Sequence, residues 1–567
     1  MAFLRRRGRH MEDNRIINEY DRYLSPLDVW AIAFGCIIGW GAFMMPGSTF
    51  LPVAGPMGTV ISMAVSMALM LVIGANFFFL MRRRPGTGGV YAYTKEAFGR
   101  DHAFLCAWFL SLSYLTVLFM NATSLFLVIR MVFGRSLQIG YYAYEIAGNH
   151  IFMGEVGASI IALAIIALLF INAKPLLQKL QTILAVVMLV CVAAVAAVCL
   201  PKLNLDSLAG AFGIRHGNRA FSIFTIVMLA PWAFVGFEVI SLETAHFDFK
   251  IQRSKWLILA AVALSGLMYA ALTLVGITSV PDGYANWQAY IADLGSLDGI
   301  AAVPTFNAAQ SALGTGGLLL MAIAALAAIL TGMIAAYRAT TRVLSTMAED
   351  HILSERFEGT TYSILFIMLV SIVISIFGRS ALTCFMELTS LGAIIAFGYT
   401  SASAWRLARR TGSRRFVVTG ILGLVFSAAF AVAQLIPKLT AIDMMGSDAY
   451  LLLSLWCLLG FMFYLRTLSR SNAPATAGAS AAGVVLFALL LYSVLMWMGK
   501  KLMTAETVQT VRETLRLEGT IMFLVVFIAL GVMVNIQRVF TKKHEALLRG
   551  RSGGKEEPHG PGDDEEA

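Results

Sequence analysis

The sequence predicts an all-α polytopic membrane protein, and three observations support that class. Of its 567 residues, 58% are hydrophobic and only 13% are charged, whereas a soluble domain carries about 25% charged residues. Apolar runs long enough to cross a bilayer recur along the chain. Lysine and arginine are concentrated in every second connection between these runs, which is the asymmetry expected of membrane topology.

About fourteen transmembrane helices are expected, because each apolar run has the length of about 17–25 residues that a span requires. The runs lie near residues 28–52, 57–81, 103–130, 155–173, 181–200, 221–243, 256–280, 315–340, 361–378, 382–404, 416–436, 449–465, 479–498 and 519–537. The predicted organisation is a cytoplasmic segment (1–26), a core of ten spans (27–410), four additional spans (411–540) and a disordered cytoplasmic tail (541–567).

The basic residues predict the orientation of the chain. If the N-terminus lies in the cytoplasm and the spans alternate, 32 of the 43 lysines and arginines fall on the cytoplasmic side. This bias fits the positive-inside rule and predicts cytoplasmic N- and C-termini in a plasma or inner cell membrane. The net charge of +10 is then explained by topology and by anionic inner-leaflet lipid, so no nucleic-acid partner is expected.

Catalytic, metal-binding and processing signals are not apparent in the sequence. All six cysteines lie inside apolar runs without CxxC spacing, which predicts buried thiols without a disulfide, metal or cofactor. Residues 1–25 are polar and basic, so no cleavable signal peptide is expected and the first span directs insertion. No Ser/His/Asp or Cys/His set that could form a catalytic site is visible, so enzymatic activity is not expected.

The first span contains an irregular stretch, GCIIGWGAFMMPG, from Gly35 to Gly47. Four glycines and a proline within thirteen residues disfavour a regular helix. In a bilayer, irregular backbone persists only where protein or a polar cavity covers it. The stretch is therefore either a broken helix that forms half of a binding site or a face of small residues for close helix packing.

The sixth span shows a second irregularity, APWAFVGFEVISLETAHFD, from Ala230 to Asp248. Pro231 and Gly236 interrupt it, and Glu238 follows the interruption. An acidic group at the centre of a span costs about 2.5–3.5 kcal/mol, which favours a functional role for Glu238. Glu243 and His246 lie nearer the end of the span, where solvation at the inner face is the simpler explanation.

Two broken helices five spans apart are typical of two inverted five-helix repeats with substrate bound between the breaks. The N-terminal end of a half-helix presents amides to an anion, and its C-terminal end presents carbonyls to a cation. The amides of Ile38 to Gly41 would then bind a carboxylate. The carbonyls around Leu229 to Ala233 would bind an ammonium group, so the predicted ligand is zwitterionic.

Four motifs resemble those of the amino acid–polyamine–organocation (APC) superfamily of permeases. They are GCIIGWGAFMMPG in the first span, PGTGGVYAYTKEAFG (Pro85–Gly99) in the first cytoplasmic loop, WAFVGFE (Trp232–Glu238) in the sixth span and TTRVLSTMAEDHIL (Thr340–Leu353) after the eighth. The resemblance covers about residues 25 to 440. It implies a leucine-transporter-like fold with a 5+5 inverted repeat and discontinuous spans 1 and 6.

The resemblance also implies roles for individual residues. The substrate-binding positions are Ile38, Gly39, Trp40, Gly41, Trp232, Phe234 and Val235. Glu238 aligns with an acid implicated in proton coupling, and Tyr91 and Tyr93 belong to a loop interpreted as a structural plug beneath the site. Asn121 in the third span either lines the pathway or joins helices.

This sequence departs from the family pattern at several positions. Trp40 stands where relatives usually have a small or hydroxyl residue, which predicts a reshaped pocket. Val187 and Met188 occupy the region of a lysine that replaces sodium in some relatives, so lysine-based coupling is not expected. Thr331 is the best-placed hydroxyl for a sodium site. The two spans after residue 479 exceed the usual twelve.

The function implied is secondary-active transport of amino acids or related amines by alternating access. Na⁺ and H⁺ are both candidate coupling ions, and the oligomeric state is not predicted. The alternative is a sensor that uses the same site without net flux. A loop at 281–311 is expected to form a short interfacial helix or a gate, and 500–518 an exposed amphipathic helix.

Overall fold

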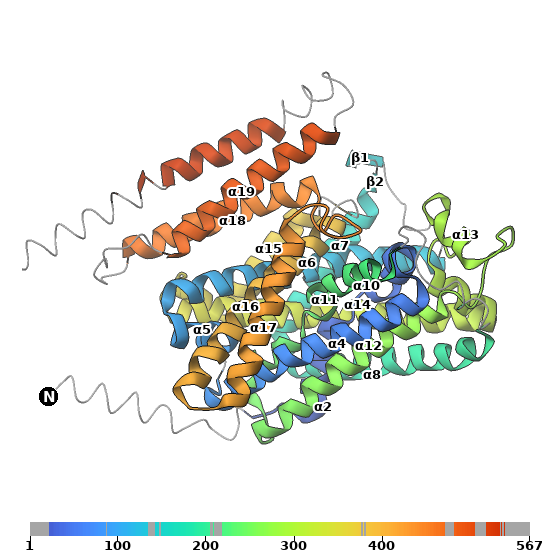
Figure 1. Ribbon diagram of the computed structural model, residues 1–567, viewed down its shortest axis with the longest axis horizontal. Coiled ribbons are helices and arrows are strands. Elements are labelled where there is room, and N and C mark those ends of the chain that lie inside the picture. The colour runs from blue at the N-terminus through green and yellow to red at the C-terminus, as the bar shows by residue number, and fades with distance from the viewer. Residues whose placement is uncertain are drawn as a thin grey trace, which may run out of the picture. The chain divides into compact units, whose positions relative to one another are not determined.

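The computed structural model describes residues 22–538, except 87, 134–141, 147–148, 204–207, 209–217, 376–377, 379–381, 471–480, 505–517, 533 and 536–537. The predicted tail at 541–567 and most of the predicted N-terminal segment lie outside the described residues. The chain divides into two compact units, one formed by Met1–Asp350 and Ser354–Ala449 and one by His351–Leu353 and Tyr450–Ala567. The elements are drawn in Figure 1.

The first span is interrupted within the predicted stretch. Helix α2 (Pro26–Ile37) begins at a capping box, in which Ser25 and Asp28 exchange hydrogen bonds. It ends at Ile37, because Ile38 is extended at φ −93° and ψ 111°. The chain turns and resumes in α3 (Gly41–Met45), a π-helical turn (Pro46–Phe50) and α4 (Leu51–Arg83).

Helix α4 is divided at Gly55, whose φ of +69° is followed by Pro56. This kink separates the second half of the first span from the second span, and it matches the predicted boundary between them. The short helix α5 (Gly89–Phe98) follows in the first loop, and α6 (Arg100–Phe133) is the third span.

Two short strands modify the all-helical prediction. Strands β1 (Tyr142–Ile146) and β2 (Asn149–Phe152) pair antiparallel before α7 (Met153–Asn172). Their residues are rich in tyrosine and isoleucine, which suit extended backbone, and the segment is too short and polar to span. Helix α8 (Lys174–Cys199) and a 3₁₀ turn (Leu200–Lys202) complete this part.

The sixth span consists of short pieces. Helices α10 (Arg219–Met228) and α11 (Ala230–Phe234) are followed by a break at Gly236, where φ is +125°. Only 3₁₀ turns follow, at Phe237–Leu242, Thr244–His246 and Ile251–Arg253, before α12 (Ser254–Val275).

The predicted external loop contains the expected short helix, α13 (Trp287–Ala292), whose Trp287 side chain is buried. A 3₁₀ turn (Leu294–Ser296) leads to α14 (Pro304–Glu349), which is kinked at Gly314. The remaining elements of the first unit are a 3₁₀ turn (Glu355–Glu358), α15 (Thr360–Ser375), α16 (Leu382–Arg410) and α17 (Arg414–Leu435). The second unit holds most of α18 (Ser447–Arg470) and α19 (Ala481–Thr504).

Ten helices among the described residues are long and apolar enough to cross a membrane. One of them, Gly41–Arg83, contains parts of two predicted spans, and four shorter apolar helices occur as well: Pro26–Ile37, Arg219–Met228, Thr360–Ile372 and Glu518–Val532. The chain is therefore a multi-pass helical membrane protein. The count of fourteen and the inverted repeat stay predictions, as does the helix at 500–518, most of which lies outside the described residues.

Candidate functional site

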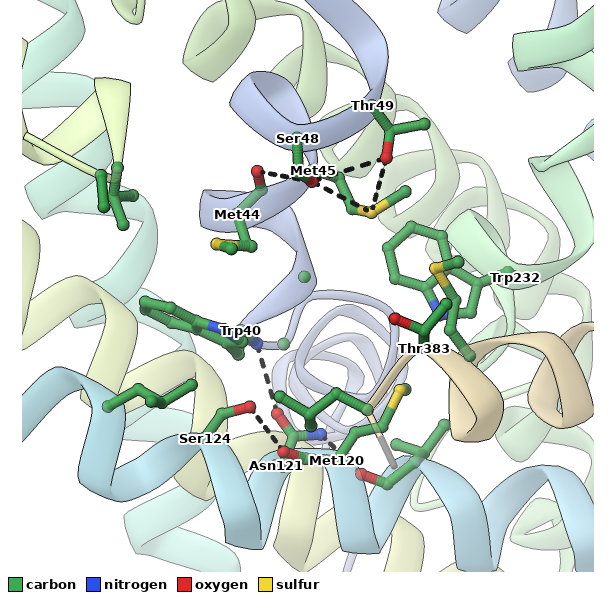
Figure 2. A pocket seen from close by; sticks show the side chains of 18 of the residues that line it. Trp40, Met44, Met45, Ser48, Thr49, Met120, Asn121, Ser124, Trp232 and Thr383 are labelled. Carbon is green, nitrogen blue, oxygen red and sulfur yellow. Dashed lines mark hydrogen bonds between the residues drawn. The ribbon is translucent and has the colours of Figure 1, made fainter. Parts of the chain in front are cut away.

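A cavity of about 620 Å³ lies where the first and sixth spans are interrupted. Its walls come from the end of α2, α3 and the π-helical turn after it, α6, α11, α12, α16, the two breaks and the connection before α14. The residues that line it are Cys36, Ile37, Gly39, Trp40, Gly41, Met44, Met45, Ser48, Thr49, Val117, Met120, Asn121, Ser124, Leu127, Arg130, Met131, Trp232, Val235, Tyr269, Leu297, Asp298, Gly299, Ala302, Val303, Leu382, Thr383 and Met386. Figure 2 shows Trp40 and Trp232 on opposite sides of it.

The two breaks pack directly against each other. A Cβ atom added to Gly236 would lie 2.7 Å from Cys36 Cβ and 2.8 Å from the Ile37 nitrogen, at the end of α2. A Cβ on Gly41 would lie 2.6 Å from Cζ2 of Trp232. The glycines therefore allow close packing between the two broken segments, and this packing brings both segments to one cavity.

Asn121 joins the third span to the first break. Its Oδ1 accepts a hydrogen bond from the Trp40 amide at 3.3 Å, and its Nδ2 donates to the Val117 carbonyl at 2.9 Å. Cβ atoms on Gly39 and Gly332 would come within 2.7 and 2.8 Å of the Asn121 amide. The sequence left open whether Asn121 lines the pathway or joins helices, and in the structure it lines the cavity and also joins helices (Figure 2).

Two of the four backbone amides predicted to bind a carboxylate already donate hydrogen bonds within the protein. The Ile38 amide donates to the Phe34 carbonyl at 3.0 Å, and the Trp40 amide donates to Asn121. The amides of Gly39 and Gly41 have no acceptor within the described part of the chain. In the sixth span, the Leu229 and Pro231 carbonyls accept bonds inside the short helix at 3.0 and 3.1 Å.

The cavity includes five of the seven predicted substrate-binding residues: Gly39, Trp40, Gly41, Trp232 and Val235. Ile38 and Phe234 are fully buried and do not line it. Phe234 instead packs near the Tyr269 ring, with centroids 6.3 Å apart. The sequence pattern did not predict the contributions of Tyr269 and of Thr383 at the start of α16, because neither lies in a recognised motif.

Glu238 lies outside the cavity, beyond Gly236. It is buried, and its Oε2 accepts a hydrogen bond from the Gly236 amide at 2.9 Å. Its Oε1 has no hydrogen-bond partner among the described residues, and the buried Tyr114 hydroxyl lies beside the carboxyl group. The carboxylate thus stabilises the break while keeping one oxygen atom available.

Thr331 faces the first span across from Gly35, where an added Cβ would lie 2.6 Å from Thr331 Cβ. Its hydroxyl donates to the Ala327 and Ala328 carbonyls of its own helix at 2.8 and 3.0 Å. The hydroxyl oxygen keeps lone pairs, but Thr331 is not part of the cavity lining.

The predicted cytoplasmic end of the sixth span is held by specific contacts. The Tyr23 and Leu24 amides donate to the His246 carbonyl at 3.1 and 3.0 Å. Arg342 lies 2.7 Å from His246 Nε2 and 3.5 Å from a Glu243 oxygen. Solvation was therefore the wrong explanation for Glu243, which is only 1% exposed and pairs with an arginine from α14.

The first-loop motif lies next to these contacts, where α5 packs against the sixth span and α14. Tyr91 and Tyr93 of α5 are buried, and Lys95 Nζ lies 2.5 Å from Asp350 Oδ1 at the end of α14. Burial raises the pKa of Asp350, but the hydrogen bond from Lys95 and the positive charge of Lys95 outweigh it and lower the pKa overall. The loop thus fastens α5 to the end of α14.

Comparison with known proteins identifies a family over most of the chain. The profile of the family described as "Amino acid permease" matches residues 24–463. The chain is 30% identical over 105 residues to Cationic amino acid transporter 4 from Homo sapiens, covering 18% of this chain and 16% of that protein. It is 30% identical over 99 residues to the Serine/threonine exchanger SteT from Bacillus subtilis, covering 18% and 22%.

A Methylthioribose transporter from Bacillus subtilis is 31% identical over 102 residues, which covers 18% of this chain and 22% of the relative. These local similarities span less than a quarter of each relative, whereas the family profile spans well over half of this chain. Together with the ten membrane-length helices, the profile match shows that the chain belongs to the amino acid permease family, whose members are transporters rather than enzymes.

Proposed function

We propose that this protein transports amino acids or related amines by alternating access, with the substrate bound between the breaks of the first and sixth spans. The observation that supports this most is the cavity itself, which contacts both breaks and reaches the predicted external connection at Leu297 to Gly299. At the predicted cytoplasmic end, the contacts of Tyr23, Leu24 and Arg342 with the sixth span close the path.

The polar groups at the breaks suit the backbone end of an amino acid. The amides of Gly39 and Gly41 remain available for a carboxylate. The positive, N-terminal end of the α3 dipole lies at the same place and also favours an anion. Asn121 Nδ2 has a second hydrogen, because only one is used by the Val117 carbonyl. Asn121 Nδ2 therefore offers the carboxylate a further donor, because two of the amides at the first break already donate within the protein.

The remaining lining favours a large, neutral, apolar side chain. Five methionines surround the cavity together with Trp40, Trp232 and Tyr269; they are Met44, Met45, Met120, Met131 and Met386. Two lining residues carry a charge. Arg130 pairs with Glu155 at 3.7 Å, and Asp298 is exposed. A cationic side chain would lose its hydration without a buried carboxylate among the lining residues to replace it.

The test is uptake by purified protein in proteoliposomes, with competition by unlabelled amino acids. Methionine, leucine and phenylalanine should compete strongly, whereas lysine and arginine should compete weakly. Strong competition by the cationic amino acids would contradict the proposed side-chain class. Measurable binding with uptake at background would favour the sensor, and uptake that does not saturate would indicate a channel.

Trp40→Ala should change substrate preference more than protein abundance. Trp40 borders the cavity and meets Phe306 edge-on, with ring centroids 6.3 Å apart. Removal of its ring enlarges the pocket and should shift the competition series toward bulkier side chains. The measurement is the ratio of half-inhibitory concentrations for tryptophan and leucine. An unchanged ratio in folded mutant protein would show that Trp40 does not select the substrate.

Glu238→Gln should flatten the pH dependence of uptake if Glu238 carries the coupled proton. Glutamine keeps an oxygen acceptor for the Gly236 amide but cannot exchange a proton. Initial uptake rates should be measured from about pH 5 to about pH 8 for both proteins, since general acid–base groups are recognised by such profiles. Identical profiles would remove Glu238 from the coupling mechanism.

Sodium coupling is the competing mechanism, and Thr331 is its proposed ligand. Replacing sodium by choline at constant pH should then abolish uptake, and Thr331→Val should do the same. Uptake that is unaffected by sodium would exclude sodium coupling, and H⁺ coupling or uncoupled exchange would remain as the mechanism.

A further inference from the structure

A second cavity of about 570 Å³ is formed on the side of the helix bundle by α4, α12 and α17. These helices lie side by side in Figure 1, with α4 in contact with both of the others. Gly74 allows α4 to approach Ile258 of α12, and Phe79 stacks on Phe416 of α17 with centroids 4.7 Å apart. We call this cavity the lateral groove. It shares no lining residue with the candidate functional site.

The lateral groove has an apolar part and a cationic end. The apolar lining residues are Leu71, Gly74, Ala75, Phe78, Trp256, Ile258, Leu259 and Phe416. Trp256 is 60% exposed and Leu259 is 37% exposed, so the groove is open to its surroundings. The polar lining residues are Arg82, Gln252, Lys255 and Arg415, and no aspartate or glutamate lines the groove.

The three basic side chains are not neutralised by neighbouring acids. Arg82, Lys255 and Arg415 are exposed, and none forms an ion pair with another described residue. Arg82 lies 5.7 Å from the Phe78 ring centroid, and the Lys255 ammonium lies 4.8 Å from that of Trp256. These rings hold two of the cations against the apolar lining.

Helix geometry adds positive potential at the same place. Helices α12 and α17 each contain 22 residues and begin at Ser254 and Arg414. Lys255 and Arg415 therefore belong to first turns, where the positive end of the helix dipole also favours an anion. Two helix N-termini and three cations thus converge on one end of an apolar groove.

We propose that the lateral groove binds one acidic phospholipid. The headgroup phosphate lies among Arg82, Lys255 and Arg415, and an acyl chain follows the apolar lining toward Leu71. The three basic residues belong to the side predicted to be cytoplasmic, where anionic lipids are concentrated in a cell membrane. The apolar lining distinguishes this occupant from free phosphate, which would use only the cationic end.

The test uses full-length protein purified in detergent. Dioleoyl phosphatidylglycerol and dioleoyl phosphatidylcholine are titrated separately, and bound lipid is counted by native mass spectrometry. One phosphatidylglycerol should bind preferentially. The combined variant Arg82→Gln, Lys255→Gln and Arg415→Gln should weaken that binding, by about fivefold per charge and about 100-fold in total, as expected for basic residues near anionic lipid.

The matched control is Lys174→Gln, Lys179→Gln and Arg356→Gln. It removes three exposed charges from the same predicted side, outside the groove, and should leave binding within about twofold of the native protein because distant exposed charges are screened. If both triple variants weakened phosphatidylglycerol binding equally, the binding would depend on general surface charge, and the proposed site would be overturned.

A second variant keeps the proposal testable if the triple variant does not fold. Ala75→Trp fills the apolar part and leaves the three cations in place, so phosphatidylglycerol binding should fall while the cationic end is unchanged. Unaltered lipid binding in folded Ala75→Trp protein would overturn the acyl-chain placement. Displacement of the lipid by millimolar inorganic phosphate would likewise show that the groove binds an anion without its tail.

Discussion

Gly236→Ala is expected to lower the free energy of unfolding by about 2–5 kcal/mol and to abolish transport. Its φ of +125° is unfavourable for any residue with a side chain. The new Cβ would also lie 2.7 Å from Cys36 Cβ and 2.8 Å from the Ile37 nitrogen. Because these atoms belong to the end of α2, the substitution forces the two breaks apart. Thermal unfolding and uptake measure the two effects.

Gly283→Ala is the matched control for backbone strain. Gly283 also has a positive φ, +98°, but nothing lies within 4 Å of the position that a Cβ atom would take there. The substitution should lower the free energy of unfolding only by the backbone strain of about 1–2 kcal/mol, and transport should be retained. If both variants lost the same stability and activity, close packing between the breaks would not be the contribution of Gly236.

Asn121→Ala is expected to reduce uptake by about 10–100-fold, which corresponds to leaving a buried hydrogen-bonding group unpaired at a cost of about 1–3 kcal/mol. The buried Trp40 amide would lose its acceptor, which is 3.3 Å away. The proposed contact from Asn121 Nδ2 to the substrate carboxylate would be lost at the same time. Saturation kinetics in proteoliposomes should show a higher KM together with a lower maximal rate.

Two further variants separate these roles of Asn121. Asn121→Asp keeps an oxygen acceptor for the Trp40 amide but places a negative charge beside the substrate carboxylate. If Asn121 only supports the break, Asp should restore uptake; if it also binds substrate, Asp should be as inactive as Ala. Ser124→Ala is the control, because Ser124 lines the same cavity but donates to its own helix at the Met120 carbonyl, 2.6 Å away.

The sequence predicted the interruptions because their cause is local. Glycine and proline act on their own backbone, so Gly35 to Gly47 and Pro231 to Gly236 identified both breaks without knowledge of the neighbouring helices. The aromatic residues of the loop at 281–311 suggested the short helix at Trp287, and the resemblance of four motifs indicated the family of the chain. Spans and breaks could therefore be located from composition and spacing.

The details of the site depended on which side chains meet across the bundle. Ile38 and Phe234 adjoin the breaks in sequence, but their side chains are buried away from the cavity. Asn121 lies in a regular helix, and its role became visible only when Gly39 and Gly332 provided space on both sides. Glu243 was assigned to solvent because its partner, Arg342, lies 99 positions later in the chain.

The sequence by itself determined the class of this protein, its apolar spans, its predicted orientation and the places where two helices break. These properties depend on residue composition and on local backbone freedom. Only the tertiary structure decided that the glycines of one break pack against the other, that Asn121 occupies one of the amides expected for substrate, and that Trp40 and Trp232 lie on opposite sides of one cavity. Such contacts join residues far apart in the chain, so no local pattern records them.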